Sequence, residues 1–153
     1  MITSPNRTAV VGRFAGKVAI VTGGTHGIGR AIVLELMREG AAVVVSGLAA
    51  DVEEGRAALA AAGFAPLVMA GDLAEESFCR ELVAQTVARH GRVDFLVNNA
   101  FSFLAKGLDA TPADFARSFS VGPVAFAVLT QLVAEPMKRQ GGGAIVNVSS
   151  ISA

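Results

Sequence analysis

The sequence predicts an α/β protein built on a doubly wound parallel sheet of five strands. Two observations carry this prediction. Short, almost continuously apolar runs alternate with longer segments whose apolar residues recur at helical spacing, which is typical of a parallel sheet covered by helices on both faces. The connections between these segments are short, and right-handed crossovers make this a doubly wound open sheet, whose strand order we expect to be 3-2-1-4-5.

The predicted elements follow one another without an internal repeat. The first helix shows Ile28, Ile32 and Leu36 on one stripe. The second and third helices cover residues 51–63 and 75–90, and each ends beside a glycine, as helices commonly do. The predicted strands cover residues 18–21, 42–45, 66–69, 93–97 and 144–148.

The fourth helix is expected to begin at Thr111, which can cap it, with Pro112 in the first helical position. Pro123 removes one helical hydrogen bond and predicts a kink near Gly122. Three consecutive glycines stop the helix before the last strand. Its apolar stripe consists of Phe115, Phe119, Phe126, Leu129, Val133 and Met137.

The composition predicts one soluble, cytoplasmic domain. A hydrophobic content of 52% with 17% charged residues excludes intrinsic disorder, and a net charge of zero without a basic cluster argues against nucleic acid as a partner. Cys79 is the single cysteine, so neither an internal disulfide nor a cysteine-built metal site is expected. The amino terminus lacks a secretory apolar region, and polar residues interrupt the apolar stretch 117–135, so no membrane span is expected.

A glycine-rich turn joins the first strand to the first helix. Gly23, Gly27 and Gly29 give the spacing Gly-x-x-x-Gly-x-Gly, which lets backbone amides and the helix N-terminus approach a pyrophosphate. A tight turn without a ligand is the alternative interpretation. The position between strand and helix favours the phosphate site.

Polar residues follow three other strands at the same expected edge of the sheet. Asp72 after the third strand can contact a ligand or cap the next helix, and both roles are compatible. Asn98 and Asn99 after the fourth strand can bind a ligand or bridge strand ends. Ser149 and Ser150 follow the fifth strand, where serines are often turn residues.

Together these motifs, in this order, resemble the amino-terminal part of a short-chain dehydrogenase/reductase over residues 14–153, with residues 1–13 as a flexible tail. The resemblance implies a Rossmann-like NAD(P)-binding domain, here incomplete at its carboxyl-terminal end and truncated after the fifth strand. It implies that Ser150 polarises a substrate carbonyl or hydroxyl. It also implies contacts to the cofactor from Thr22, Gly23, Thr25, His26, Gly27, Ile28, Gly29, Asp72, Leu73, Asn98 and Ala100.

The chain departs from the family pattern in two ways. The family uses a tyrosine, followed four residues later by a lysine, as its acid/base group, and this sequence contains no tyrosine. Val121, Gly122 and Pro123 stand where the family has an active-site asparagine. We therefore expect hydride transfer between a nicotinamide and a carbonyl or alcohol substrate in the family, and no turnover from this chain. A non-catalytic nucleotide-binding or assembly module is the alternative.

The resemblance leaves both NAD and NADP open as cofactors. Gly47 stands where an NAD enzyme has an aspartate, and Leu48 stands where an NADP enzyme often has an arginine. The absence of a repelling carboxylate favours NADP. The fifth strand lacks the lysine or proline that protects sheet edges, so the sequence also predicts a self-associating protein or homo-oligomer.

Overall fold

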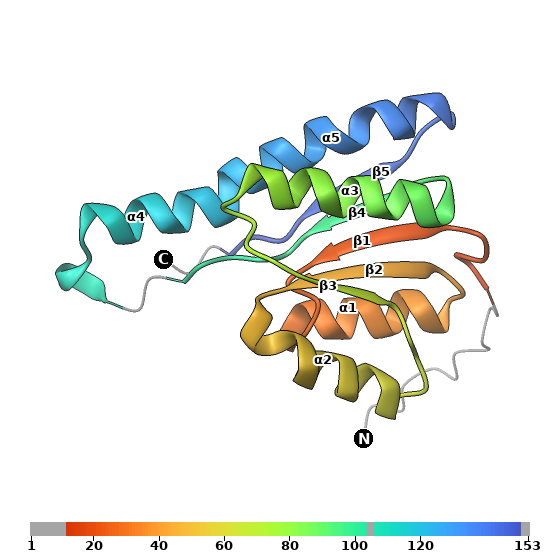
Figure 1. Cartoon of the computed structure of the whole chain (residues 1–153), viewed down its shortest axis with the longest axis horizontal. Helices are drawn as coiled ribbons and strands as arrows, with labels where there is room; N and C mark the ends of the chain where they lie inside the picture. The colour runs from red at the N-terminus through yellow and green to blue at the C-terminus, as the bar shows by residue number, and fades with distance from the viewer. Residues whose placement is uncertain (1–11, 104–105, 151–153) are drawn as a thin grey trace, which may run out of the picture.

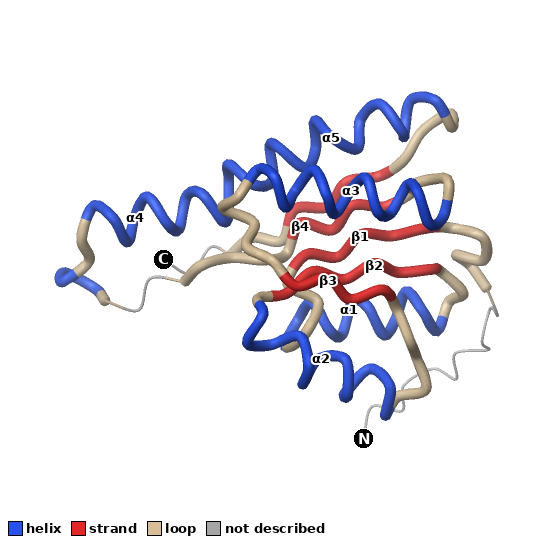
Figure 2. Tube along the Cα trace, in the orientation of Figure 1, coloured by secondary structure: helices blue, strands red, loops and turns tan. Residues whose placement is uncertain are grey.

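The computed structural model describes residues 12–103 and 106–150, in which a parallel sheet lies between two layers of helices (Figure 1). The five strands lie in the order β3-β2-β1-β4-β5, and each neighbouring pair is parallel. Helices α1 and α2 cover one face, and α3 and α5 cover the other (Figure 2). The predicted doubly wound fold and its strand order are confirmed.

Helices and strands alternate along the chain close to their predicted positions. The strands are β1 (Val18–Thr22), β2 (Ala42–Gly47), β3 (Leu67–Ala70), β4 (Phe95–Asn98) and β5 (Ala144–Asn147). The helices are α1 (Gly27–Arg38), α2 (Ala49–Ala61), α3 (Glu76–His90), α4 (Pro112–Phe119) and α5 (Ala125–Arg139), with a short 3-10 turn at Gly107–Asp109.

The sheet separates the hydrophobic core into two clusters, because successive residues of a strand point to opposite faces. Ile20 of β1 and Leu96 of β4 pack with α3 and α5. Val21 of β1 packs on the other face with Val33 of α1 and Leu59 of α2. All five of these side chains are fully buried.

The stripe predicted for α1 is confirmed in part, since Ile32 and Leu36 are partly buried and pack against the core but Ile28 does not. Gly29 and Val33 are the buried residues of the helix, whereas Ile28 is 66% exposed. Ile28 lies in the first turn, beyond the end of the sheet. The apolar pattern alone did not show where the sheet ends, and so it placed Ile28 on the buried face.

The predicted fourth helix consists of α4, a π-helical turn at Ser120–Val124 and α5. Thr111 forms the predicted cap, since its hydroxyl accepts a hydrogen bond from the amide of Asp114. The π-helical turn contains Pro123, whose missing amide proton favours a local departure from α-helix.

This turn and the course of α4 away from the sheet (Figure 1) explain why the predicted stripe is only half buried. Phe115 and Phe119 of α4 are exposed, and Leu129, Val133 and Met137 of α5 lie in the core. By length and composition alone, the continuous helical stretch Pro112–Arg139 could cross a membrane. Its α5 part packs against the sheet as a core helix does.

A buried carboxylate joins strands at the amino-terminal edge of the sheet. Asp94 is 4% exposed and accepts hydrogen bonds from the Val18 amide at 2.9 Å, from Arg92 at 2.6 and 2.7 Å and from Lys17 at 3.2 Å. Burial raises the pKa of Asp94, but these donors outweigh burial and lower the pKa to about 2. The carboxylate therefore holds the start of β1 beside the segment that leads into β4.

The two ends of the described chain differ in packing. The predicted tail, residues 1–13, lies outside the described residues except for its last two, which belong to a turn, and Arg13 pairs with Glu39 at 2.8 Å. At the other end, β5 is exposed along its length, with Ile145 37% and Val146 53% exposed.

Candidate functional site

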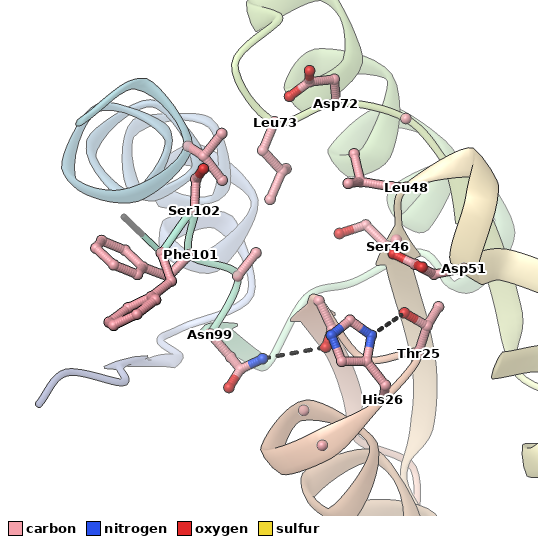
Figure 3. A pocket seen from close by; sticks show the side chains of 18 of the residues that line it. Thr25, His26, Ser46, Leu48, Asp51, Asp72, Leu73, Asn99, Phe101 and Ser102 are labelled. Atoms are coloured by element: carbon pink, nitrogen blue, oxygen red, sulfur yellow. Dashed lines mark hydrogen bonds between the residues drawn. The ribbon is translucent and has the colours of Figure 1, made fainter. Parts of the chain in front are cut away.

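A cavity of about 670 Å³ lies at the carboxyl-terminal edge of the sheet, where ligands bind in doubly wound folds (Figure 3). Its size falls in the range of small-molecule and cofactor sites. Loops after β1, β2, β3 and β4 contribute to its wall, and α4 and the π-helical turn contribute one side chain each. The lining residues are Gly23, Thr25, His26, Gly27, Ile28, Gly29, Ser46, Gly47, Leu48, Asp51, Gly71, Asp72, Leu73, Asn99, Ala100, Phe101, Ser102, Phe103, Arg117 and Val121.

The glycine-rich turn requires glycine for two different reasons. Gly23 and Gly27 have positive φ angles of 63° and 53°, which other residues rarely adopt. Gly29 has an ordinary backbone conformation, but a Cβ there would collide with the carbonyl oxygen of Gly23. The turn is therefore held tightly against the first turn of α1.

The N-terminus of α1 offers free backbone donors to the cavity. The first helical hydrogen bond runs from the Arg30 amide to the His26 carbonyl, so the amides of the three preceding residues have no helical acceptor. His26 is the N-cap residue of α1, but its side chain makes no capping hydrogen bond to the helix. The first turn of α1 contains no acidic residue. Such an end favours an anion such as a pyrophosphate.

Thr22 and Asn99 fasten the end of β1 to the end of β4. The Thr22 hydroxyl accepts hydrogen bonds from the amides of Asn99 at 2.9 Å and Ala100 at 3.0 Å. The Asn99 side chain donates to the carbonyl oxygens of Thr22 at 3.0 Å and Gly23 at 3.2 Å, as Figure 3 shows in part. This clip fixes the position of the glycine-rich turn.

Thr22 and Asn98, both predicted to contact the cofactor, lie beneath the cavity and not on its wall. Both side chains are fully buried. Asn98 donates to Asn147 at 2.9 Å and thereby joins β4 to β5. The neighbouring Asn99 lines the cavity, because side chains alternate along a strand.

Three contacts hold α4 and the π-helical turn over the far side of the cavity. Arg117 donates to Asp72 at 2.6 Å, and the Ser118 hydroxyl donates to the Ser102 carbonyl at 2.8 Å. The ring of Phe101 packs on Gly122 so closely that a Cβ there would lie 3.0 Å from it. Phe101 thus lies where a side chain at position 122 would be.

Asp72 lies on the cavity wall but does not cap α3 as predicted, because the N-cap of that helix is Glu75, which makes no side-chain capping hydrogen bond. One carboxylate oxygen accepts the Ala74 amide at 2.9 Å, which closes the turn before α3, and the other accepts Arg117. Burial raises the pKa of Asp72, but these two donors have the larger combined effect and lower it. The carboxylate is thus charged at the cavity wall.

Part of the cavity wall is apolar and partly open. Ile28, Phe101 and Phe103 all line the cavity, although they are 66%, 58% and 78% exposed. The opposite wall, after β2, carries Ser46 and Asp51 (Figure 3). The cavity therefore has one apolar side and one polar side.

Ser150 lies at the carboxyl-terminal end of β5, at the same edge of the sheet, but does not line the cavity. The side chain is exposed. The backbone before it continues the sheet, since the Val148 amide donates to the Asn98 carbonyl at 2.9 Å.

The structure brings most of the predicted cofactor residues to one cavity. Those on its wall are Gly23, Thr25, His26, Gly27, Ile28, Gly29, Asp72, Leu73 and Ala100. The sequence did not predict that Asp51 and Arg117 line the cavity. Asp51 lies in the first turn of α2, and its short distance from the end of β2 could have marked it as a candidate for the cavity wall. No feature of the sequence around Arg117 marks that residue.

Comparisons with known proteins agree with this architecture. The model of the short chain dehydrogenase family matches residues 17–153. The 7alpha-hydroxysteroid dehydrogenase of Escherichia coli (strain K12) is 37% identical over 146 residues, which are 92% of this chain and 56% of that protein.

Two solved structures are similar in fold. One is a 7 alpha-hydroxysteroid dehydrogenase complexed with NADH and 7-oxo glycochenodeoxycholic acid, with a TM-score of 0.82 and 34% identity over 91% of this chain and 55% of that one. The other is a metagenomic short-chain oxidoreductase in complex with NADP, with a TM-score of 0.77 and 33% identity over 90% of this chain and 64% of that one. The chain spans about half the length of the curated relatives it matches.

Proposed function

Because the chain belongs to the short-chain dehydrogenase family, we propose that its cavity binds a nicotinamide dinucleotide, NAD(H) or NADP(H), for hydride transfer to or from a small carbonyl or alcohol substrate. The observation that carries the proposal is the N-terminus of α1 at the cavity. It combines unpaired backbone amides, a turn that only glycines can form and space for a ligand.

The residues present fit such a cofactor along the whole cavity. The amides of residues 27–29 would hold the pyrophosphate. Asp72 and Leu73, on the wall formed by the loop after β3, would contact the adenine, and Ala100 would lie along the ribose of the nicotinamide half. A bound dinucleotide would supply the hydride donor or acceptor.

Ser150 is the proposed group that orients the oxygen of the substrate. Its hydroxyl can donate a hydrogen bond to a carbonyl or accept one from an alcohol. The proton that accompanies hydride transfer needs a second group, and the sequence contains no tyrosine to supply it. The 153-residue polypeptide is therefore expected to bind dinucleotide without catalysing turnover.

Calorimetric titration of the 153-residue chain with NAD⁺, NADP⁺ and their reduced forms tests the proposal. We expect saturable binding of at least one dinucleotide and no protein-dependent oxidation of NADPH or NADH with common ketones. Absence of binding to every dinucleotide would overturn the assignment of the cavity. Robust turnover would show that another group replaces the missing tyrosine.

A second role as an assembly module is favoured by the exposed edge of β5. Ile145 and Val146 leave apolar surface beside backbone groups that meet no further strand in the described part of the chain and can pair with a strand of another chain. We propose that the chain self-associates through this edge. Sedimentation equilibrium should show oligomers at micromolar concentration, and Val146→Lys should reduce them, whereas a compact monomer would contradict the proposal.

Cytoplasmic location stays a prediction.

A further inference from the structure

The end of the cavity beside β2 carries two polar groups to which the fold assigns no partner. Asp51 lies half-buried on the wall, and no hydrogen bond or ion pair of its carboxylate occurs among the described residues. Ser46 is 1% exposed, and its buried hydroxyl has no hydrogen-bond partner within the described part of the chain. Both line the cavity together with Gly47 and Leu48. A buried hydroxyl without a partner is costly, so it points to a ligand that completes it.

The positive charges of this region do not neutralise Asp51. Arg117 lines the cavity but is bound to Asp72 at 2.6 Å. Arg56, further along α2, contacts the Val68 carbonyl at 3.3 Å and Glu53 at 3.8 Å. His26 contacts the Thr25 hydroxyl at 3.2 Å. The β2 end of the cavity is therefore acidic.

The position of this acidic end follows from the other contacts of the proposed cofactor. The adenine is assigned to Asp72 and Leu73, and the pyrophosphate to the N-terminus of α1. The adenosine ribose joins these two groups, so it must pass the wall between them. That wall is the end of β2 with Ser46 and Asp51, as Figure 3 shows.

We propose that Asp51, assisted by Ser46, selects a dinucleotide with a free 2'-hydroxyl, NAD(H), and rejects the 2'-phosphorylated NADP(H). This inference rests on the proposed function. The carboxylate accepts hydrogen bonds from ribose hydroxyls, whereas a phosphate monoester carries a charge of about −1.5 to −2 and is repelled. The preference for NADP that the sequence suggested depended on the absence of a carboxylate at positions 47 and 48. In the structure, Asp51 supplies a carboxylate to the same part of the cavity wall.

An alternative role for Asp51 is structural, since a carboxylate in the first turn of α2 interacts favourably with the helix dipole. That role predicts a change in stability and none in the choice between dinucleotides. The ratio of the two affinities therefore separates the roles.

The test measures the affinities of the 153-residue chain for NADH and NADPH by nucleotide fluorescence, with Asp51→Asn as the main variant. Glu54→Gln is the matched control, because Glu54 is exposed on the same helix and lies outside the cavity wall. We expect the unaltered chain to bind NADH about tenfold more tightly than NADPH. Asp51→Asn should raise NADPH affinity several-fold and lower NADH affinity slightly, and Glu54→Gln should leave the ratio unchanged.

A second measurement needs no variant and does not depend on the nicotinamide half. Adenosine 5'-monophosphate should bind more tightly than adenosine 2',5'-bisphosphate at low salt, and the difference should shrink as salt screens the repulsion. Equal dinucleotide affinities, tighter binding of NADPH, or an Asp51→Asn variant that shifts both dinucleotides together would overturn the role of Asp51 and leave the proposed function standing. Failure of every nucleotide to bind would overturn both.

Discussion

The two ends of the sheet use polar groups in opposite ways. At the amino-terminal edge, Asp94 is saturated with hydrogen bonds from Val18, Arg92 and Lys17. At the carboxyl-terminal edge, the Ser46 hydroxyl and the first amides of α1 have no partner within the described residues and face a cavity. The amino-terminal edge therefore contributes stability and the carboxyl-terminal edge carries the proposed binding site, so substitutions at the two edges should have separable effects.

The largest expected effect is the loss of dinucleotide binding in Gly29→Val. A side chain at this position collides with the carbonyl oxygen of Gly23 and with the Asn99 amide, so the glycine-rich turn cannot keep its shape. We expect affinity to fall by about a hundredfold or more, because the amides of α1 no longer point at the pyrophosphate. Calorimetry with the preferred dinucleotide measures the change, and unchanged affinity would show that the turn is only structural.

A matched control for this prediction is Gly63→Val. Gly63, unlike Gly29, has a positive φ angle, of 86°, and it follows α2 outside the cavity wall. The backbone strain should lower stability by about 1 kcal/mol. The affinity of the folded fraction should stay unchanged, in contrast with Gly29→Val.

The next effect is a loss of stability in Asp94→Asn. The amide keeps one acceptor but leaves Arg92 and Lys17 without their counter-charge, and we expect the free energy of unfolding to fall by about 2–3 kcal/mol. Urea denaturation measures this loss. Dinucleotide affinity should not change, and a parallel loss of affinity would break the separation between the two edges.

The loss caused by Asp94→Asn should depend on pH. The pKa of Asp94 is lowered to about 2 in the fold, against about 3.9 in an unfolded chain, so the carboxylate stabilises the fold above pH 4. This contribution disappears as the pH falls through 2. The difference in unfolding free energy between the two proteins should be constant from pH 7 to pH 5 and shrink towards pH 2. A constant difference over the whole range would contradict the assignment of the pKa.

The smallest effect is expected for Arg117→Gln, which tests whether the binding edge also depends on an ion pair. The pair with Asp72 is partly exposed, so its loss should cost stability no more than about 1 kcal/mol. Asp72 is the proposed adenine contact, and without Arg117 it is held less firmly, so we expect dinucleotide affinity to fall by about threefold to tenfold. Arg80→Gln is the control, since it removes an exposed ion pair on α3 outside the cavity. If Arg117→Gln and Arg80→Gln bound the dinucleotide with equal affinity, Arg117 would have only a packing role and would not support binding.

The doubly wound sheet and the glycine-rich turn could be predicted from local patterns. The alternation of apolar runs and helical stripes predicts the elements, and right-handed crossovers between them make the sheet doubly wound. The position of Gly23, Gly27 and Gly29 directly after an apolar run was enough to place the turn at the edge of the sheet where the cavity lies. An interruption of the α-helix at Pro123 was also predictable, because the missing amide proton is a property of the residue, and the structure has a π-helical turn there.

Which side chains reach the cavity depends on the tertiary structure. A strand alternates its faces with each residue, and the fold puts Asn99 and not Asn98 on the cavity wall. The place of Ile28 depended on where the sheet ends, and that of Asp51 on the path of the first turn of α2. Arg117 meets Asp72 from 45 residues away, a contact set by the course of α4 over the sheet. Long-range packing leaves no mark in the local pattern of residues, and for this reason the sequence could locate the cavity but not complete its wall.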